Sequence, residues 1–243
     1  MVKISCGETT FANIKAIIFD KDGTLEESHN FLRELAQRRS RLVDARVPGV
    51  GEPLLMAFGV CDRATLDPKG LMAVGSRAEN IIAAAAYIAE TGRSWFESLD
   101  IARNAFTEAD RTLHRTAQNS PLLPGTLEML QRCSAVGLKL GILSAATPQG
   151  VREFVERHQL RPYFQLEMGV SPQGPFKPSP DLFLNACTAL DVAPEKTLMV
   201  GDSALDMQMA RQAKAAGAIA VCQQGGSLEG ADVAIARFEE LNF

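Results

Sequence analysis

The sequence of 243 residues lacks the features of a membrane or exported protein. Its longest uninterrupted apolar run, residues 81–89, has nine residues, whereas a membrane-spanning helix needs about 20. Lys3 and Glu8 interrupt the N-terminal stretch where a signal peptide requires apolar residues. We therefore expect no membrane partner and no export.

Surplus positive charge and paired cysteines are also missing. The 25 Lys and Arg residues are outnumbered by 29 Asp and Glu residues, and a net charge of −4 argues against a nucleic-acid partner. The cysteines form no Cys-x-x-Cys pair, which favours free thiols in a reducing cytoplasm over disulfides or zinc ligands. They are Cys6, Cys61, Cys133, Cys187 and Cys222. The expected partner is a small molecule, in a cytoplasmic monomer or homodimer.

What the sequence does have is a globular composition, with 46% hydrophobic and 22% charged residues. After residue 120, helical patterns alternate with short apolar runs, which is typical of an α/β fold with a doubly wound, Rossmann-like parallel sheet. The predicted helices are 126–136, 148–158, 180–190 and 204–215, and the predicted strands are 138–143, 164–168, 197–200, 218–222 and 231–235. An apolar run at 16–19 predicts a first buried strand of the same sheet.

The segment between these parts has helical periodicity and almost no strand-like alternation. Helices are expected at 31–43 and 53–60, with two more beginning after Ser76 and Ser94, which are good N-cap residues. We therefore predict a Rossmann-like catalytic core made of residues 1–25 and 121–243, with residues 26–120 inserted as a helical cap domain. A short hairpin over 2–6 and 9–11 is expected to precede the first strand.

Polar residues stand where the predicted strands end, at the edge where open parallel sheets bind ligands. Asp20 and Asp22 follow the first strand, Ser144 the second, Lys177 the third, and Asp202 and Asp206 the fourth. Strand alternation predicts that Asp20 and Asp22 face one side while Lys21 points away. Two such carboxylates can divide nucleophilic attack and proton transfer between them.

Four carboxylates in a partly buried site require a compensating cation. Oxygen ligands with no His or Cys nearby favour Mg²⁺ over zinc. Two helix starts add anion-binding capacity, because Thr147-Pro148 and Ser179-Pro180 each place a cap residue before a first-turn proline. The predicted ligands are therefore Mg²⁺ and a phosphate group.

As an ordered set, these motifs resemble the haloacid dehalogenase superfamily, in its phosphatase branch related to phosphoglycolate phosphatases. The set consists of Asp20-Lys21-Asp22-Gly23-Thr24, Ser144 after Gly141-Ile142-Leu143, Lys177-Pro178, and Gly201-Asp202-Ser203-Ala204-Leu205-Asp206.

The resemblance implies that Asp20 forms an aspartyl-phosphate and that Asp22 moves the protons. It further implies phosphate binding by Thr24, Ser144, Ala145 and Lys177, and Mg²⁺ binding by Asp20, Asp22 through its backbone carbonyl, Asp202 and, in an outer shell, Asp206.

The predicted function is a Mg²⁺-dependent phosphatase that hydrolyses a small phosphate monoester such as phosphoglycolate. A phosphomutase of the same superfamily remains an alternative, because the same residues can return the phosphoryl group to a second hydroxyl. A phospho-accepting signalling protein without turnover is a more distant alternative. No motif identifies the substrate, although Arg63 and Arg77 are candidates to contact an anionic leaving group.

Overall fold

The computed structural model describes residues 2–61, 65–171 and 174–243. The chain divides into two compact units: a sheet unit, Met1–Glu27 with Pro121–Phe243, and a helical unit, Ser28–Ser120. The division falls two residues beyond the predicted boundary after Leu25, because the backbone of residues 25–27 pairs with that of 121–123. Leu123 N donates to Leu25 O at 2.9 Å, and Glu27 N donates to Pro121 O at 2.8 Å.

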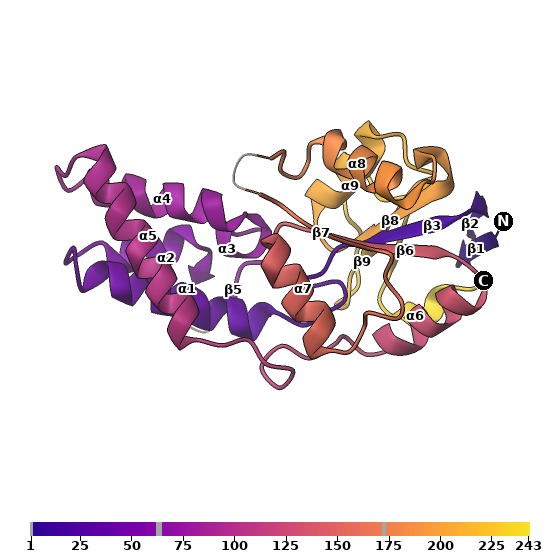
Figure 1. Cartoon of the computed structure of the whole chain (residues 1–243), viewed down its shortest axis with the longest axis horizontal. Helices are drawn as coiled ribbons and strands as arrows, with labels where there is room; N and C mark the ends of the chain where they lie inside the picture. Colours follow the sequence, from indigo (N-terminus) through magenta and orange to yellow (C-terminus); the bar gives the residue numbers. More distant parts are fainter. Residues whose placement is uncertain (1, 62–64, 172–173) are drawn as a thin grey trace. The chain divides into compact units, whose positions relative to one another are not determined.

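A six-stranded parallel sheet forms the centre of the sheet unit, and it confirms the predicted fold class (Figure 1). The strand order is β10-β9-β8-β3-β6-β7, with β3 between the strands that follow later in the chain. The strands are β3 Ala16–Phe19, β6 Lys139–Ser144, β7 Leu166–Gly169, β8 Thr197–Gly201, β9 Gly217–Val221 and β10 Val233–Ile235. The first strand coincides with its predicted range, and each of the others lies within two residues of its predicted start.

Alternate residues of the sheet face two separate helical layers. Ile17 and Phe19 belong to the apolar cluster that includes α6 and α7, whereas Ala16 and Ile18 belong to the cluster with α8 and α9. Figure 1 shows the two helix pairs on opposite sides of the sheet. The helices are α6 Thr126–Ala135, α7 Pro148–Arg157, α8 Pro180–Leu190 and α9 Ala204–Gln212. Burial on both faces explains why the central strands read as continuous apolar runs.

The predicted N-terminal hairpin is present as β1 Val2–Cys6 and β2 Thr9–Ile14, with η1 Pro194–Lys196 and η2 Phe238–Glu240 as short 3-10 helices elsewhere in the sheet unit. Ser5 and Asn242 exchange two backbone hydrogen bonds of 2.9 Å, which ties the hairpin to the last residues of the chain. All five cysteines are free thiols. Within the described residues, no helix has the length and apolarity to cross a membrane.

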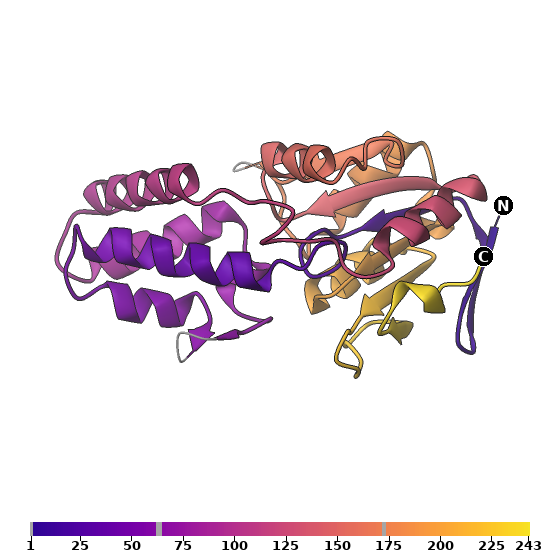
Figure 2. The same ribbon diagram turned by 90° about the horizontal axis from the view of Figure 1, so that it is seen from below.

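The helical unit has its own apolar core, in which α5 packs against α1 and α4 (Figure 2). Its elements are α1 His29–Asp44, α2 Gly51–Ala57, β4 Val60–Cys61, β5 Thr65–Leu66, α3 Leu71–Val74, α4 Arg77–Ala89 and α5 Trp95–Thr112. Ser76 and Ser94 are the N-caps of α4 and α5, as predicted. The helix expected to reach residue 60 ends at Ala57, because Gly59 takes a left-handed conformation with φ +86°.

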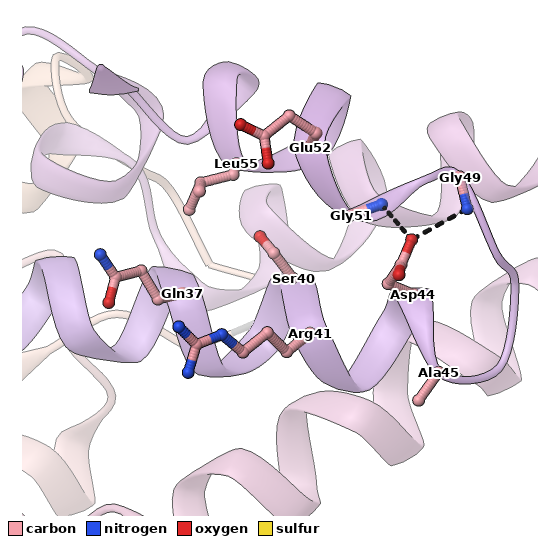
Figure 3. A pocket seen from close by; sticks show the side chains of 9 residues that line it. All are labelled: Gln37, Ser40, Arg41, Asp44, Ala45, Gly49, Gly51, Glu52 and Leu55. Carbon is pink, nitrogen blue, oxygen red and sulfur yellow. Dashed lines mark hydrogen bonds between the residues drawn. The ribbon is translucent and has the colours of Figure 1, made fainter. Parts of the chain in front are cut away.

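A pocket of about 460 Å³ lies within the helical unit, between α1 and α2 (Figure 3). Asp44 on its wall accepts hydrogen bonds of 2.9 Å from the backbone N–H groups of Gly49 and Gly51. Those two bonds close the turn that joins the helices, so this carboxylate has a structural role.

Candidate functional site

The strand order brings several of the predicted site residues to one edge of the sheet. Asp20 directly follows β3, and its backbone N–H donates to Val200 O at 2.8 Å, so the chain leaves β3 alongside β8. Asp202 directly follows β8, and Asp206 lies in the first turn of α9. The carboxyl ends of these two neighbouring strands therefore deliver three acidic side chains to the same place.

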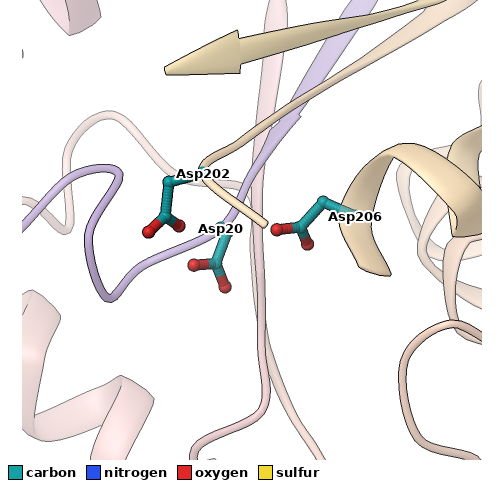
Figure 4. Close-up of side chains that lie close together, drawn as sticks. All are labelled: Asp20, Asp202 and Asp206. Atoms are coloured by element: carbon teal, nitrogen blue, oxygen red, sulfur yellow. The ribbon is translucent and has the colours of Figure 1, made fainter. Parts of the chain in front are cut away.

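Asp20, Asp202 and Asp206 form an acidic cluster in which one carboxylate oxygen from each residue lies within 4.8 Å of the other two (Figure 4). Asp206 is fully buried and Asp20 is 7% exposed. Among the residues that the structure describes, this is the group of acidic side chains with the spacing to hold a metal ion.

Lys177 brings one positive charge to the acidic cluster. Its ammonium Nζ lies 2.6 Å from Asp20 Oδ1 and 2.7 Å from Asp206 Oδ1. The side chain is 6% exposed and comes from the segment between β7 and α8. One ammonium against three carboxylates leaves an excess of negative charge in a buried place.

This excess is visible in the acidities of the side chains. The pKa of Asp20 is raised to about 6, chiefly by burial. The attraction of Lys177 opposes this shift, and the charge of Asp206 adds to it. Burial, followed by repulsion from Asp20, also raises the pKa of Asp202 well above its ordinary value. The charges of Asp20 and Asp206 raise the pKa of Lys177, although its burial acts in the opposite direction. Buried carboxylates that resist ionisation, and that offer only oxygen donors, fit a hard divalent cation.

The turn after β3 is shaped around Asp202. Thr24 is fully buried, and its hydroxyl Oγ1 donates to Asp202 Oδ1 at 3.0 Å, so this predicted phosphate-binding side chain positions an acid of the cluster. Gly23 has φ +76°, and a Cβ there would lie 2.0 Å from Asp202 Oδ2. Only glycine fits this position without displacing Asp202.

Ser144 ends β6, and Ala145 begins the short connection to α7. The Ser144 hydroxyl oxygen is buried and accepts from Ala146 N at 3.1 Å. As predicted, Thr147 caps α7 by accepting from Gly150 N at 3.1 Å, with Pro148 in the first turn. Ser179 is the N-cap of α8 by position, but its side chain makes no capping bond.

Sequence reasoning missed one residue of the site. Ser203 donates its hydroxyl hydrogen to Asp206 Oδ2 at 2.6 Å, and Asp206 N in turn donates to Ser203 Oγ at 3.3 Å. This capping box holds Asp206 in the first turn of α9. The signal was present in the sequence, because a serine three residues before an acid at a helix start has this pattern.

The predicted orientation of Lys21 is wrong. Its ammonium lies 2.5 Å from Asp22 Oδ2 instead of pointing away, because β3 ends at Phe19 and strand alternation does not extend to residues 20–22. The Asp22 carboxylate thus lies outside the acidic cluster, and metal binding through its backbone carbonyl stays a prediction. Arg77 pairs with Asp110 at 2.9 Å, within the helical unit, and Arg63 lies outside the described residues.

A doubly wound parallel sheet with buried carboxylates and a lysine at its carboxyl edge has the architecture of α/β proteins that bind ligands beyond the ends of their strands. The model of the haloacid dehalogenase-like hydrolase family matches residues 14–214, and the chain belongs to this family.

Among curated proteins, the chain is similar to phosphoglycolate phosphatases. It is 30% identical to that of Nitrosococcus oceani over 49% of this chain and 51% of the relative, so it spans about half the length of that protein. With the enzyme of Aliivibrio fischeri it shares 29% identity over 84% of this chain and 82% of the relative.

Solved structures have the same fold. A HAD phosphatase from Thermococcus onnurineus superposes with a TM-score of 0.62 at 21% identity, covering 93% of this chain and 95% of the other. A HAD-superfamily hydrolase from Geobacter sulfurreducens superposes with a TM-score of 0.60 at 19% identity, covering 94% of both chains. At these identities the likeness establishes the fold alone.

Proposed function

We propose that this protein is a Mg²⁺-dependent phosphatase that hydrolyses a small phosphate monoester, such as phosphoglycolate, through an aspartyl-phosphate. One observation carries the proposal: Asp20 is held at the exit of the central strand, 2.6 Å from the Lys177 ammonium and within the acidic cluster. A carboxylate beside a fixed cation can attack an electrophile that itself carries negative charge. The similarity to phosphoglycolate phosphatases supports the same reaction and suggests the substrate class.

Each side chain has a role in the proposed reaction. An Asp20 carboxylate oxygen attacks phosphorus, the bond to the leaving oxygen breaks, and Asp22 gives that oxygen its proton. Asp22 then takes a proton from water, whose oxygen attacks phosphorus and releases inorganic phosphate and the free Asp20 carboxylate. Lys177 and Ser144 hold the phosphoryl oxygens, with the N–H groups at the start of α7 contributing positive potential.

Mg²⁺ would be held by Asp20, the backbone carbonyl of Asp22, and Asp202, with Asp206 in an outer shell. Two observations support this assignment: burial and, after it, repulsion between the carboxylates raise the pKa values of Asp20 and Asp202, and one ammonium faces the three carboxylates. When bound, the ion would offset charge on the phosphoryl oxygens.

We assign substrate selection to the helical unit, acting as a cap domain. The insertion begins at Ser28, four residues after Thr24 in the sequence. Its sequence contains no recognised specificity motif.

The test is release of inorganic phosphate from p-nitrophenyl phosphate and from phosphoglycolate, with Mg²⁺ and with a chelator. Turnover should require Mg²⁺ and should fall by about 10³-fold or more in Asp20→Asn. Asp191→Asn is the matched control, since Asp191 is exposed at the end of α8 and Asn tolerates its left-handed backbone. Absence of turnover on every monoester, or full turnover in Asp20→Asn, would refute the proposal. Transfer to a second hydroxyl instead of release would identify a phosphomutase.

A further inference from the structure

Lys21 is a charged side chain in a place with no access to solvent. It is 0% exposed, and its Nζ lies 5.7 Å from the centre of the Phe154 ring. Two carboxylates compensate the ammonium: Asp22 Oδ2 at 2.5 Å and Glu26 Oε2 at 3.3 Å. A buried ammonium costs several kcal/mol in lost hydration unless it is closely paired, so these contacts fix its position.

Glu26 is also 0% exposed and connects this pair to the helix that follows Ser144. Its Oε1 accepts from Arg157 Nη2 at 2.6 Å and lies 3.4 Å from His158 Nε2, at the end of α7. The carboxylate therefore lies between a lysine of the β3 loop and two basic side chains of α7. This arrangement ties the loop to a rigid element of the sheet unit.

The backbone of the same loop is closed by its own hydrogen bonds. The N–H groups of Leu25 and Glu26 donate to Lys21 O at 2.9 and 3.0 Å, and Gly23 N donates to Glu26 O at 2.9 Å. Lys21 and Glu26 are thus held together by main chain and side chain. In contrast, the Asp22 side chain retains 20% exposure, so it is anchored by Lys21 while remaining accessible.

We propose that Lys21 and Glu26 are positioning residues for Asp22: Glu26 fixes the Lys21 ammonium, and the ammonium fixes the Asp22 carboxylate for proton transfer. This inference rests on the proposed function, in which Asp22 protonates the leaving oxygen. Both side chains are fully buried, so the proposed role is exerted through Asp22 and not by contact with substrate. Their effect is to restrict Asp22 to one orientation, which matters because proton transfer requires hydrogen-bond geometry.

The test compares two leaving groups. p-Nitrophenolate departs without a proton, whereas the alkoxide of phosphoglycolate requires one. Loss of Asp22 positioning therefore lowers kcat/KM, which covers the steps up to departure of the leaving group, selectively for phosphoglycolate, while the later activation of water by Asp22 is common to both substrates and enters kcat alone. In Lys21→Met we expect kcat/KM for phosphoglycolate to fall by about 10²-fold and kcat/KM for p-nitrophenyl phosphate by about threefold or less. Glu26→Gln should shift the same ratio in the same direction by a smaller factor, because the Lys21–Asp22 contact remains.

The ratio of the two kcat/KM values is independent of the fraction of enzyme that is folded, so a purely structural role leaves it unchanged. Equal losses of kcat/KM on both substrates, an unchanged kcat/KM, or a higher kcat/KM in Lys21→Met would overturn the positioning role while leaving the phosphatase proposal intact. A wild-type protein without turnover on either substrate would overturn both. Arg152→Met, on the exposed side of α7, is the matched control and should leave the ratio unchanged.

Discussion

Each of the two units contains a cluster of charged groups with surplus charge of one sign, and the two clusters differ in how far solvent reaches them. In the helical unit, Arg39 and Arg77 share one carboxylate, Asp110, at 3.0 and 2.9 Å. Asp110 is 37% exposed, and the Arg39 guanidinium lies 4.3 Å from the centre of the Phe106 ring. Solvent and an aromatic face therefore accommodate the surplus positive charge.

The acidic cluster of the sheet unit has the opposite sign, and solvent reaches mainly Asp202, which is partly exposed. Three carboxylates face one ammonium, and Asp20 and Asp206 are almost completely buried. A surplus that solvent reaches is compatible with a purely structural role, whereas a buried surplus favours protonation or a ligand of opposite charge. The contrast supports the proposed site in the sheet unit.

Among the variants that test this contrast between the two units, the largest effect is expected from packing against Asp202. Gly23→Ala places a Cβ 2.0 Å from Asp202 Oδ2 and imposes a side chain on a backbone with φ +76°, so Asp202 must move. We expect a loss of about 10² -fold in kcat, as a displacement of about 1 Å can produce, together with a lower melting temperature. The measurements are steady-state kinetics and thermal unfolding.

The helical unit offers the matched control for that prediction. Gly49 also has a left-handed backbone, with φ +93°, but a Cβ there meets nothing within 4 Å. Gly49→Ala should cost about 1 kcal/mol of stability from backbone strain and leave kcat unchanged. A similar kcat for the two variants would show that the contact with Asp202 is unimportant.

A smaller effect is expected from metal binding in the wild-type protein. Without metal, the raised pKa of Asp20, about 6, means that the folded protein holds a proton more tightly than the unfolded chain. The stability contributed by this group is therefore present at low pH and lost as the pH rises through about 6. Mg²⁺ competes with that proton, so its stabilising effect should be small at about pH 5 and reach about 2 kcal/mol near pH 7.5.

Thermal unfolding with and without Mg²⁺ across this range measures the effect. Asp202→Asn should remove most of it, whereas Asp110→Asn in the helical unit should leave it unchanged. A stabilisation that is equal at both ends of the pH range would argue against ion binding by the acidic cluster.

The smallest effect concerns the cluster of the helical unit. Arg39→Met replaces a buried guanidinium with an apolar side chain of similar length. Asp110 then remains paired with Arg77 and in contact with solvent. We expect a loss of about 1 kcal/mol in the free energy of unfolding by urea, with kcat per folded molecule unchanged. A large fall in kcat would contradict the assignment of this cluster to structure alone.

Much of the fold was predictable because its signals are local. The apolar run at 16–19 matches β3, and Ser76, Ser94 and Thr147 cap the helices predicted for them. The helix expected to reach residue 215 ends at Gln212, since Lys214 takes a left-handed conformation, φ 56°, that the sequence does not signal with glycine.

The candidate site was predictable to the extent that strand order determines it. Residues at the ends of adjacent parallel strands must converge, which is why Asp20 and Asp202 were identified without coordinates. The orientation of Lys21 was not predictable in this way, because it depends on Glu26 and on Arg157, which is 131 residues away in sequence from Glu26. Pairings across such distances have no local signal.

The paired backbone of residues 25–27 and 121–123 has a consequence for the architecture. Because the backbone segments that lead into and out of the helical unit are paired, residues 28–120 form one closed loop between two adjacent points of the sheet unit. The entropic penalty of such a loop grows only with the logarithm of its length. An insertion at this point can therefore change in size or be replaced with little effect on the stability of the sheet.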